Sequence, residues 1–242
     1  DTILLNRDND CFAVKHISDI NASEPTGDEF DIFVYGSKYS LPLGSDPETI
    51  STDAAYNEIR LTADVVGCIA RTFRVAHPWF SPAGMTRGQI KNVLKLKNPP
   101  TATQASALYS NKINPVLSFP GEGVVLFGNK TGADASSLLS KIEISSLFIY
   151  LKKRIGAIAR RILFEQNTAS SRQSFINQVT SVLESVRTRN GITEFSIICD
   201  ETNNPADVVS EGSFVATIFV KPARSVETLE ITFTNANEGE VL

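Results

Sequence analysis

The sequence has few of the residues that build disulfide frameworks, metal sites and catalytic triads. Its 242 residues include three cysteines, two histidines, one methionine and one tryptophan. Cys11, Cys68 and Cys199 lie far apart, and an odd number of isolated thiols indicates a reducing compartment rather than a disulfide framework. His16 and His77 have no cysteine or second histidine at metal-ligand spacing. We therefore expect no metal, no cofactor and no catalytic residue.

The sequence also lacks a long apolar run and an excess of positive charge. No stretch approaches the length that a membrane span needs, and no signal peptide is visible at the start. The net charge is −4, and one basic cluster without a second argues against nucleic acid as a partner. We expect neither a membrane nor a nucleic acid partner. The chain opens at Asp1 and its one methionine is Met85, which indicates a processed product or an excised piece without its native termini.

The stretch from Ser145 to Asn167 has the periodicity of a long helix. Apolar residues recur at steps of four, four, three and four, which places them on one face: Leu147, Leu151, Ile155, Ile158 and Ile162. Positive residues occupy the remaining circumference: Lys152, Lys153, Arg154, Arg160 and Arg161. This positive face is either a solvated helix surface or a contact face for an acidic partner, and the pattern leaves both open.

Helices and strands alternate along the rest of the chain. Further helices are expected at 63–73, from Thr101 or Thr103 to 111, and at 171–189, where Gly191 is a fitting stop. Strands are expected at 2–5, 11–17, 30–35, 114–119, 124–127, 194–199, 213–220 and 226–233. The segment 213–220 is apolar on both faces, which predicts a strand that is covered on both sides.

This order of elements predicts an α/β fold with a mixed β-sheet flanked by helices, ending in a two-helix plus three-strand unit. We divide the chain into a border region (1–54), a first core part (55–137) and a C-terminal part packed on the same core (138–242). The loop at 77–88 is rich in proline and glycine but holds Trp79 and Phe80, so we expect a rigid, ordered turn.

Three candidate chemistries fail on spacing. The stretch Gly123 to Thr131 resembles a phosphate-binding loop, but Asn129 interrupts the Gly-Lys-Thr order and the intervening residues form a strand. No Gly-x-Ser-x-Gly elbow supports a serine hydrolase. The acidic residues around Asp200 lack calcium-loop spacing and are typical of an Asx-turn loop.

Several short motifs in a fixed order resemble the contractile tail sheath proteins of long-tailed (myovirus-type) bacteriophages. They lie at 63–71, 78–84 with 87–88, 114–116, 119–128 with 130–131, 199–204, 214–216 and 221–224. The resemblance runs from about Ala55 to Phe233 and identifies nine motif residues as structural: Pro78, Trp79, Pro82, Gly84, Gly121, Gly123, Gly128, Asp200 and Asn204. The first fifty residues match little of the family.

The resemblance implies a structural subunit with no enzymatic activity. Such subunits stack as hexameric rings into a helical tube around the tail tube, above a baseplate. The sheath contracts and drives the tube through the host envelope for genome ejection. The implied location is the virion tail, with assembly in the host cytoplasm.

The resemblance also implies how the subunits hold one another. In this family, terminal arms add strands to neighbouring sheets, and 213–220 and 226–233 are the candidates to supply or border the open edge. The five cations of 152–161 would then face an acidic surface of an adjacent subunit or of the tube. Two alternatives stay open: the sheath of a bacterial contractile injection device, and a hydrolase-like α/β enzyme with a cleft near Asp200 and the 120–123 turn.

Overall fold

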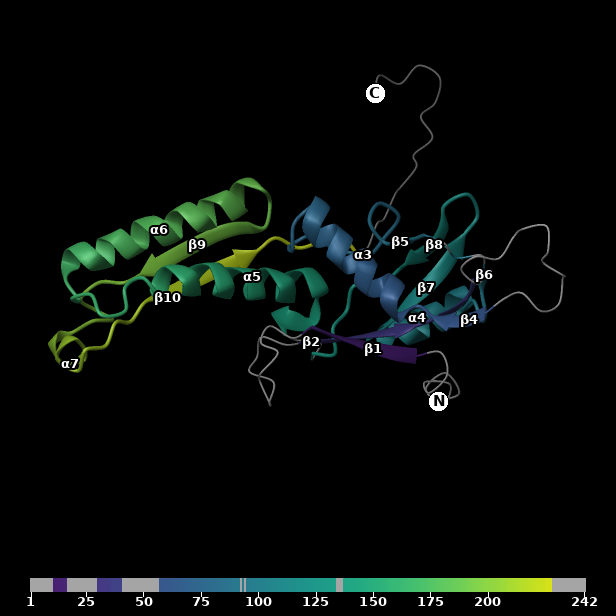
Figure 1. Cartoon of the computed structure of the whole chain (residues 1–242), viewed down its shortest axis with the longest axis horizontal. Helices are drawn as coiled ribbons and strands as arrows, with labels where there is room; N and C mark the ends of the chain where they lie inside the picture. Colours follow the sequence, from purple (N-terminus) through teal and green to yellow (C-terminus); the bar gives the residue numbers. More distant parts are fainter. Residues whose placement is uncertain are drawn as a thin grey trace, which may run out of the picture.

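The chain folds as two parts that follow one another along the long axis of the molecule (Figure 1). The computed structural model describes residues 11–16, 30–40, 57–91, 93, 95–133 and 137–227. One part holds the larger sheet with α3 and α4, and the other holds α5, α6 and a two-stranded sheet (Figure 1). Within the described residues, no helix is both long enough and apolar enough to span a bilayer.

The first part is built on a mixed five-stranded sheet in the order β1-β2-β7-β8-β5. Its strands are β1 (Cys11–His16), β2 (Phe30–Tyr35), β7 (Ile113–Phe119), β8 (Gly123–Leu126) and β5 (Gln89–Ile90). Only β2 and β7 pair in parallel, while the other neighbours are antiparallel. The predicted mixed sheet is therefore confirmed.

A smaller antiparallel sheet and two helices complete this part. The sheet has the order β4-β3-β6, formed by β4 (Asn57–Arg60), β3 (Ser37–Ser40) and β6 (Lys95–Leu96). The helices are α3 (Thr62–Val75) and α4 (Ala102–Ser110). Of the two expected starts, Thr101 and Thr103, the structure shows Thr101 as the N-cap of α4, with a capping box that includes Gln104.

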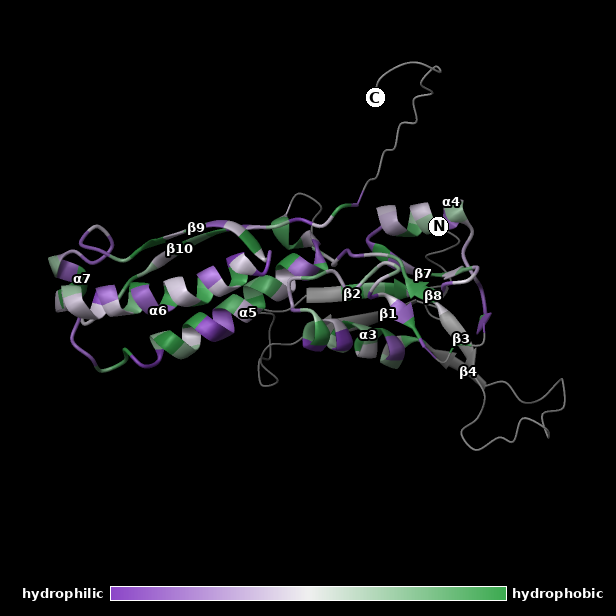
Figure 2. Cartoon of the chain, turned by 90° about the horizontal axis from the view of Figure 1, so that it is seen from above, coloured by the Kyte–Doolittle hydropathy of each residue, from purple (hydrophilic) through white to green (hydrophobic). Residues whose placement is uncertain are grey.

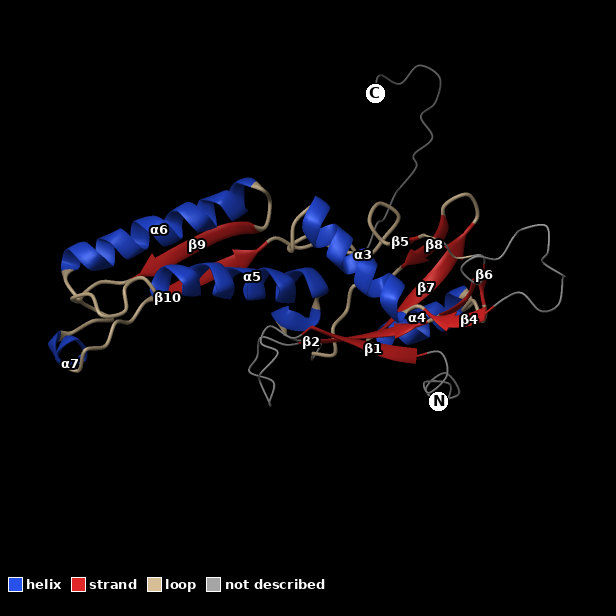
Figure 3. Cartoon of the chain, in the orientation of Figure 1, coloured by secondary structure: helices blue, strands red, loops and turns tan. Residues whose placement is uncertain are grey.

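The second part is a helix pair packed on one face of a hairpin-like sheet (Figure 3). Its elements are η2 (Leu138–Ser140), α5 (Ile142–Ala159), α6 (Ala169–Thr188), β9 (Ile192–Ile198), α7 (Ala206–Ser210) and β10 (Thr217–Pro222). Strands β9 and β10 pair antiparallel. Along α5 and α6, hydrophobic and hydrophilic residues alternate as an amphipathic pattern requires (Figure 2).

Each part has its own apolar core. The first core packs β2, β7, β8 and α3 around fully buried residues such as Val34, Leu61 and Val116. The second core packs α5, α6 and β9 around Leu147, Val179 and Leu183. Trp79 comes from the loop after α3 yet belongs to the second core, so this loop ties the two parts together.

Three sequence expectations need correction. The long helix begins at Ile142 and ends at Ala159, so Arg160 and Arg161 lie in the following turn rather than on the helix. Residues 213–216 are not strand, and the outer face of β10 is exposed rather than covered. The third C-terminal strand is not observed at 226–227, and 228–233 lie outside the described residues, as do 2–5.

The helix stop after α6 also differs from the expectation. Asn190, not Gly191, adopts the left-handed conformation, with φ of 60°. Gly191 is needed for a different reason, because a Cβ there would lie 2.6 Å from Val186 and 2.9 Å from the Trp79 ring.

Candidate subunit interface

The positive face of α5 is exposed, as its periodicity predicts. Lys152, Lys153 and Arg154 are exposed, whereas Leu147 and Leu151 of the apolar stripe are buried. The Arg154 guanidinium lies 5.9 Å from the centre of the Tyr150 ring, which orients it over the helix surface. Arg160 and Arg161 are exposed as well, so all five cations are accessible to a partner.

The turn between α5 and α6 forms an apolar and basic tip, residues 160–165. Ile162 tucks back against the second core, but Leu163 is 62% exposed and the Phe164 side chain is fully exposed. Phe164 has φ of 73°, a left-handed conformation that is unfavourable for a bulky residue. The sequence prediction missed this tip because it extended the helix to Asn167, across a segment with no glycine or proline.

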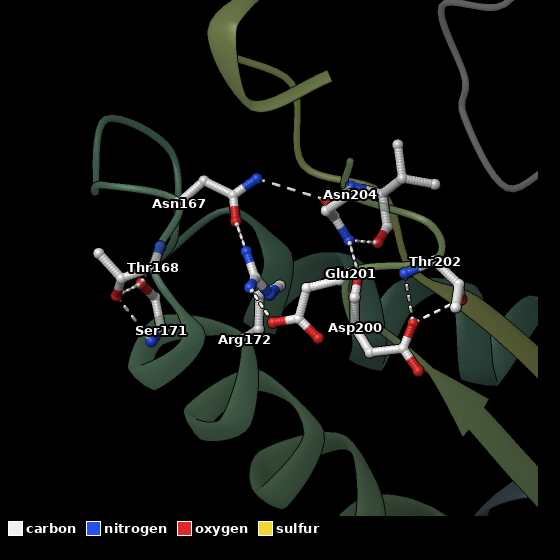
Figure 4. A network of polar contacts seen from close by, with 9 residues as sticks. Asn167, Thr168, Ser171, Arg172, Asp200, Glu201, Thr202 and Asn204 are labelled. Carbon is white, nitrogen blue, oxygen red and sulfur yellow. Dashed lines mark hydrogen bonds and ion pairs between the residues drawn. The ribbon is translucent and has the colours of Figure 1, made fainter. Parts of the chain in front are cut away.

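A polar network closes the end of the second part (Figure 4). Asn204 is buried and holds the loop between β9 and β10. Its amide donates to Asp200 O at 3.2 Å and Val215 O at 2.8 Å, and its carbonyl accepts from Val215 N at 2.8 Å. Asn167 reaches the same loop, since its amide donates to the Asn204 side-chain oxygen at 3.3 Å and to Ser213 O at 2.8 Å.

Asp200 belongs to this loop as an Asx turn, as the sequence indicates. Its carboxylate accepts from the Thr202 N–H at 2.9 Å and from the Thr202 hydroxyl, and these hydrogen bonds lower the pKa of Asp200. Glu201 pairs instead with Arg172, at 3.1 Å. Within the described residues no group of histidine, cysteine and acidic side chains is placed to hold a metal ion.

The loop at 77–88 is rigid because Trp79 anchors it. Trp79 is 6% exposed, its indole N–H donates to Arg189 O at 3.0 Å, and its ring packs edge-on against Tyr150 at 5.4 Å. His77 stacks on the other side of the indole at 4.6 Å. Trp79 is therefore buried in the second core, and the loop bridges the two parts.

The motif prolines and glycines sit where chain segments approach closely or turn. Pro82 is buried and Pro78 half-buried in the same loop. Gly84 donates its N–H to Leu126 O at 2.9 Å and has φ of 89°. A Cβ at Gly128 would lie 2.6 Å from the Asn114 side chain, so the close approach excludes larger residues.

The turn between β7 and β8 explains the last two motif glycines. Gly121 and Gly123 have φ of 84° and 83°, which favours glycine at both positions of this exposed turn. The turn lies in the first part, whereas Asp200 lies at the far end of the second (Figure 1). Among the described residues the two regions therefore do not form the shared cleft that the hydrolase alternative expects.

The two-stranded sheet β9–β10 leaves backbone edges without a strand partner in the described part of the chain. Its inner residues pack on α5 and α6. Its outer face carries Phe219, 56% exposed, opposite Ser196, and a Lys221–Glu194 ion pair at 3.3 Å. A two-stranded sheet is only marginally stable by itself, and its free edges can pair with a further strand.

A groove of about 930 Å³ runs between α4, the 77–88 loop, strands β7 and β8, and the segment 223–227 that follows β10. Three motif residues, Trp79, Gly84 and Gly128, line it together. At one end the Glu143 carboxylate, 3% exposed, accepts from the Asn129 amide and, at 2.7 Å, from the Ser225 hydroxyl. Glu227 forms an ion pair with Lys141 and accepts from the Tyr109 hydroxyl at 3.3 Å. The groove therefore combines apolar walls with buried acceptors.

Sequence comparisons find similarity to one group of proteins. Residues 134–235 match the family model described as "Phage tail sheath C-terminal domain". The tail sheath protein of Vibrio phage KVP40 is 39% identical over 188 residues, which is 76% of this chain and 28% of that protein. The tail sheath protein of Enterobacteria phage T4 gives the same identity and coverage, and that of Salmonella phage ViI is 34% identical over 167 residues. The chain thus spans about a quarter of the length of these relatives.

Solved structures support the same fold. The sheath complex of an extracellular contractile injection system, PVC, in its contracted state superposes with a TM-score of 0.71 at 17% identity, covering 84% of this chain and 55% of that chain. The helical sheath of the anti-feeding prophage, also contracted, gives 0.70 at 15% identity, covering 83% and 54%.

Proposed function

We propose that this chain, a member of the phage tail sheath protein family, forms part of the core of a contractile sheath subunit. In this proposal the subunits polymerise helically as stacked hexameric rings around a tail tube and above a baseplate. Contraction of the polymer then drives the tube through the host envelope, with no chemistry inside the subunit. The subunit assembles in the host cytoplasm and ends in the virion tail.

The observation that carries this proposal is the incomplete sheet β9–β10. Both strands have a free edge within the described residues, and the outer face exposes Phe219. A strand from a neighbouring subunit would pair with this edge through backbone hydrogen bonds, which persist while the subunits reorient. The family likeness supports this reading because helical sheaths are among the structures with the same fold.

The five exposed cations supply a second contact. Lys152, Lys153, Arg154, Arg160 and Arg161 face an acidic surface of an adjacent subunit or of the tube. Polar contacts suit a switching interface because they exchange without exposing a large apolar patch. In our proposal the C-terminal part, 138–242, carries these contacts, and 55–137 supports it from the first core.

A charge reversal tests this second contact in the complete protein. The double variant Arg154→Glu with Arg161→Glu should impair sheath assembly or contraction, measured as the fraction of extended and contracted sheaths in electron micrographs. Arg74→Glu is the matched control, because Arg74 is an exposed cation on α3 in the other part. If the double variant forms unaltered sheaths that contract normally, the proposed contact between these cations and an acidic surface is wrong.

A sheath of a bacterial contractile injection device is the second candidate. The superpositions on contracted injection-system sheaths favour it, since they cover more than four fifths of this chain. The level of identity to phage tail sheath proteins favours the phage. Purified particles decide the matter, because a phage tail carries a DNA-filled head and an injection device does not.

A further inference from the structure

The α5–α6 tip, residues 160–165, has the composition of a protein-binding surface. It exposes two large apolar side chains, Leu163 and Phe164, directly after two cations, Arg160 and Arg161. An exposed phenylalanine in a left-handed conformation costs free energy on its own, so its burial elsewhere would offset that cost. A partner surface for this tip must offer both an apolar hollow and a negative group.

The groove between α4, the 77–88 loop, β7, β8 and the segment 223–227 offers both. Its walls include Pro115, Leu117, Phe119 and Phe127, and its volume lies within the range of about 300–1,000 Å³ that is usual for sites enclosing compact ligands. Phe127 is 45% exposed, and its ring centre lies 5.2 Å from that of Phe119. The two rings therefore form an apolar surface that a partner side chain can contact.

Around Glu143 the groove has more hydrogen-bond acceptor atoms than donors to fill them. The side-chain oxygen of Asn129 is buried and has no partner in the described part of the chain. The Glu143 carboxylate beside it receives two donors, from Asn129 and Ser225, whereas a carboxylate can accept about four. Both of these described donors are neutral groups, and a buried carboxylate favours a cationic donor.

Two arginines also line the groove, but neither donates to the Glu143 carboxylate in a described hydrogen bond. The Arg87 guanidinium donates to Ser81 O at 2.7 Å and lies over the Phe80 ring at 5.3 Å, so it is engaged with the 77–88 loop. Arg224 is exposed on the segment that follows β10.

We propose that the groove receives the α5–α6 tip of another copy of the sheath subunit. Leu163 and Phe164 would lie on the apolar walls, and Arg160 or Arg161 would reach the Glu143 carboxylate and the unpaired Asn129 oxygen. Within one copy the tip lies at the far end of the second part, away from α4, β7 and β8 (Figure 1). The contact is therefore heterologous, and repetition of such a contact builds open helical assemblies. This inference rests on the proposed function and names one of its interfaces.

A photocrosslinking experiment on the complete sheath protein tests the contact. Phe164 is replaced by p-benzoylphenylalanine, sheaths are assembled and irradiated, and the crosslinked peptides are identified by mass spectrometry. We expect crosslinks to a second sheath subunit within 102–129, the segment that supplies α4, β7 and β8 to the groove. The same label at Phe219, on the outer face of β10, is the matched control and should give a different partner peptide.

The other outcomes overturn the proposal. Crosslinks from position 164 to the tube protein, to another region of the sheath subunit, or to nothing would each refute it. A second variant, Leu163→Ala with Phe164→Ala, alters only exposed side chains and should raise the concentration needed for polymerisation about tenfold. Normal striated sheaths with misplaced crosslinks would defeat this contact alone, whereas the absence of sheaths from the unaltered protein would defeat the proposed function.

Discussion

Gly191→Ala is the substitution that most directly probes the joint between the two parts. A Cβ at this position would lie 2.6 Å from Val186 and 2.9 Å from two atoms of the Trp79 ring. Trp79 is the residue through which the 77–88 loop enters the second core, and it is held by a hydrogen bond to Arg189 O at 3.0 Å. The new methyl group must therefore displace the indole or the helix end that carries Arg189.

The size of the effect follows from overpacking. Adding a methyl group to a closely packed core costs about 1–3 kcal/mol in the free energy of unfolding. With a urea dependence of about 1–3 kcal/mol per molar, the unfolding midpoint should fall by roughly 1 M. Gly156→Ala is the matched control, because nothing lies within 4 Å of a Cβ there and the residue is helical. Alanine is favoured over glycine in a helix by about 0.5–1 kcal/mol, so this variant should unfold at higher urea concentration.

The assay uses the tryptophan itself. Trp79 is the only tryptophan of the chain, so intrinsic fluorescence reports on the joint without labelling. In urea titrations the unfolding midpoint of Gly191→Ala should be lower than that of the parent protein, and the midpoint of Gly156→Ala should be higher. The fluorescence of folded Gly191→Ala should also peak at a longer wavelength than that of the folded parent. An unchanged midpoint and emission for Gly191→Ala would refute the packing described here.

Two further predictions concern pH and the β9–β10 loop. Burial, with the Glu227 carboxylate beside the hydroxyl, raises the pKa of Tyr109 above its ordinary value, so the folded state keeps the proton that the unfolded chain loses. Stability should therefore fall as pH rises above about 10, and Tyr109→Phe should lessen that fall in urea midpoints measured across this range. Asn204→Ala should lower the free energy of unfolding by about 2–3 kcal/mol, because it leaves the backbone groups of Val215 unpaired. The exposed Asn177→Ala on α6 should stay within about 0.5 kcal/mol, and equal effects for the two would contradict the role given to Asn204.

Local patterns predicted most elements because their causes are local. Two candidate capping residues, Thr101 and Thr103, placed the start of α4 to within two positions, and the steps of three and four in 147–158 identified the core-facing side of α5. Turn residues between two apolar runs located β7 and β8. The helix end at Ala159 was missed because no stop residue follows it.

Contacts between segments that are distant in the chain could not be predicted from local sequence patterns. Trp79 and Arg189 are separated by 110 positions, and only the fold brings them within hydrogen-bond distance. Gly191 reads as a helix stop, yet its neighbour Asn190 takes that conformation while the glycine makes room for Trp79. The groove likewise depends on α4, the 77–88 loop and the segment after β10, which meet only in three dimensions.

Electron cryomicroscopy of the complete protein tests the central claim most directly. We expect striated helical tubes in which a strand from a neighbouring subunit pairs with a free edge of the β9–β10 sheet. Tubes whose β9–β10 sheet stays two-stranded, or a protein that forms no tubes at all, would contradict it.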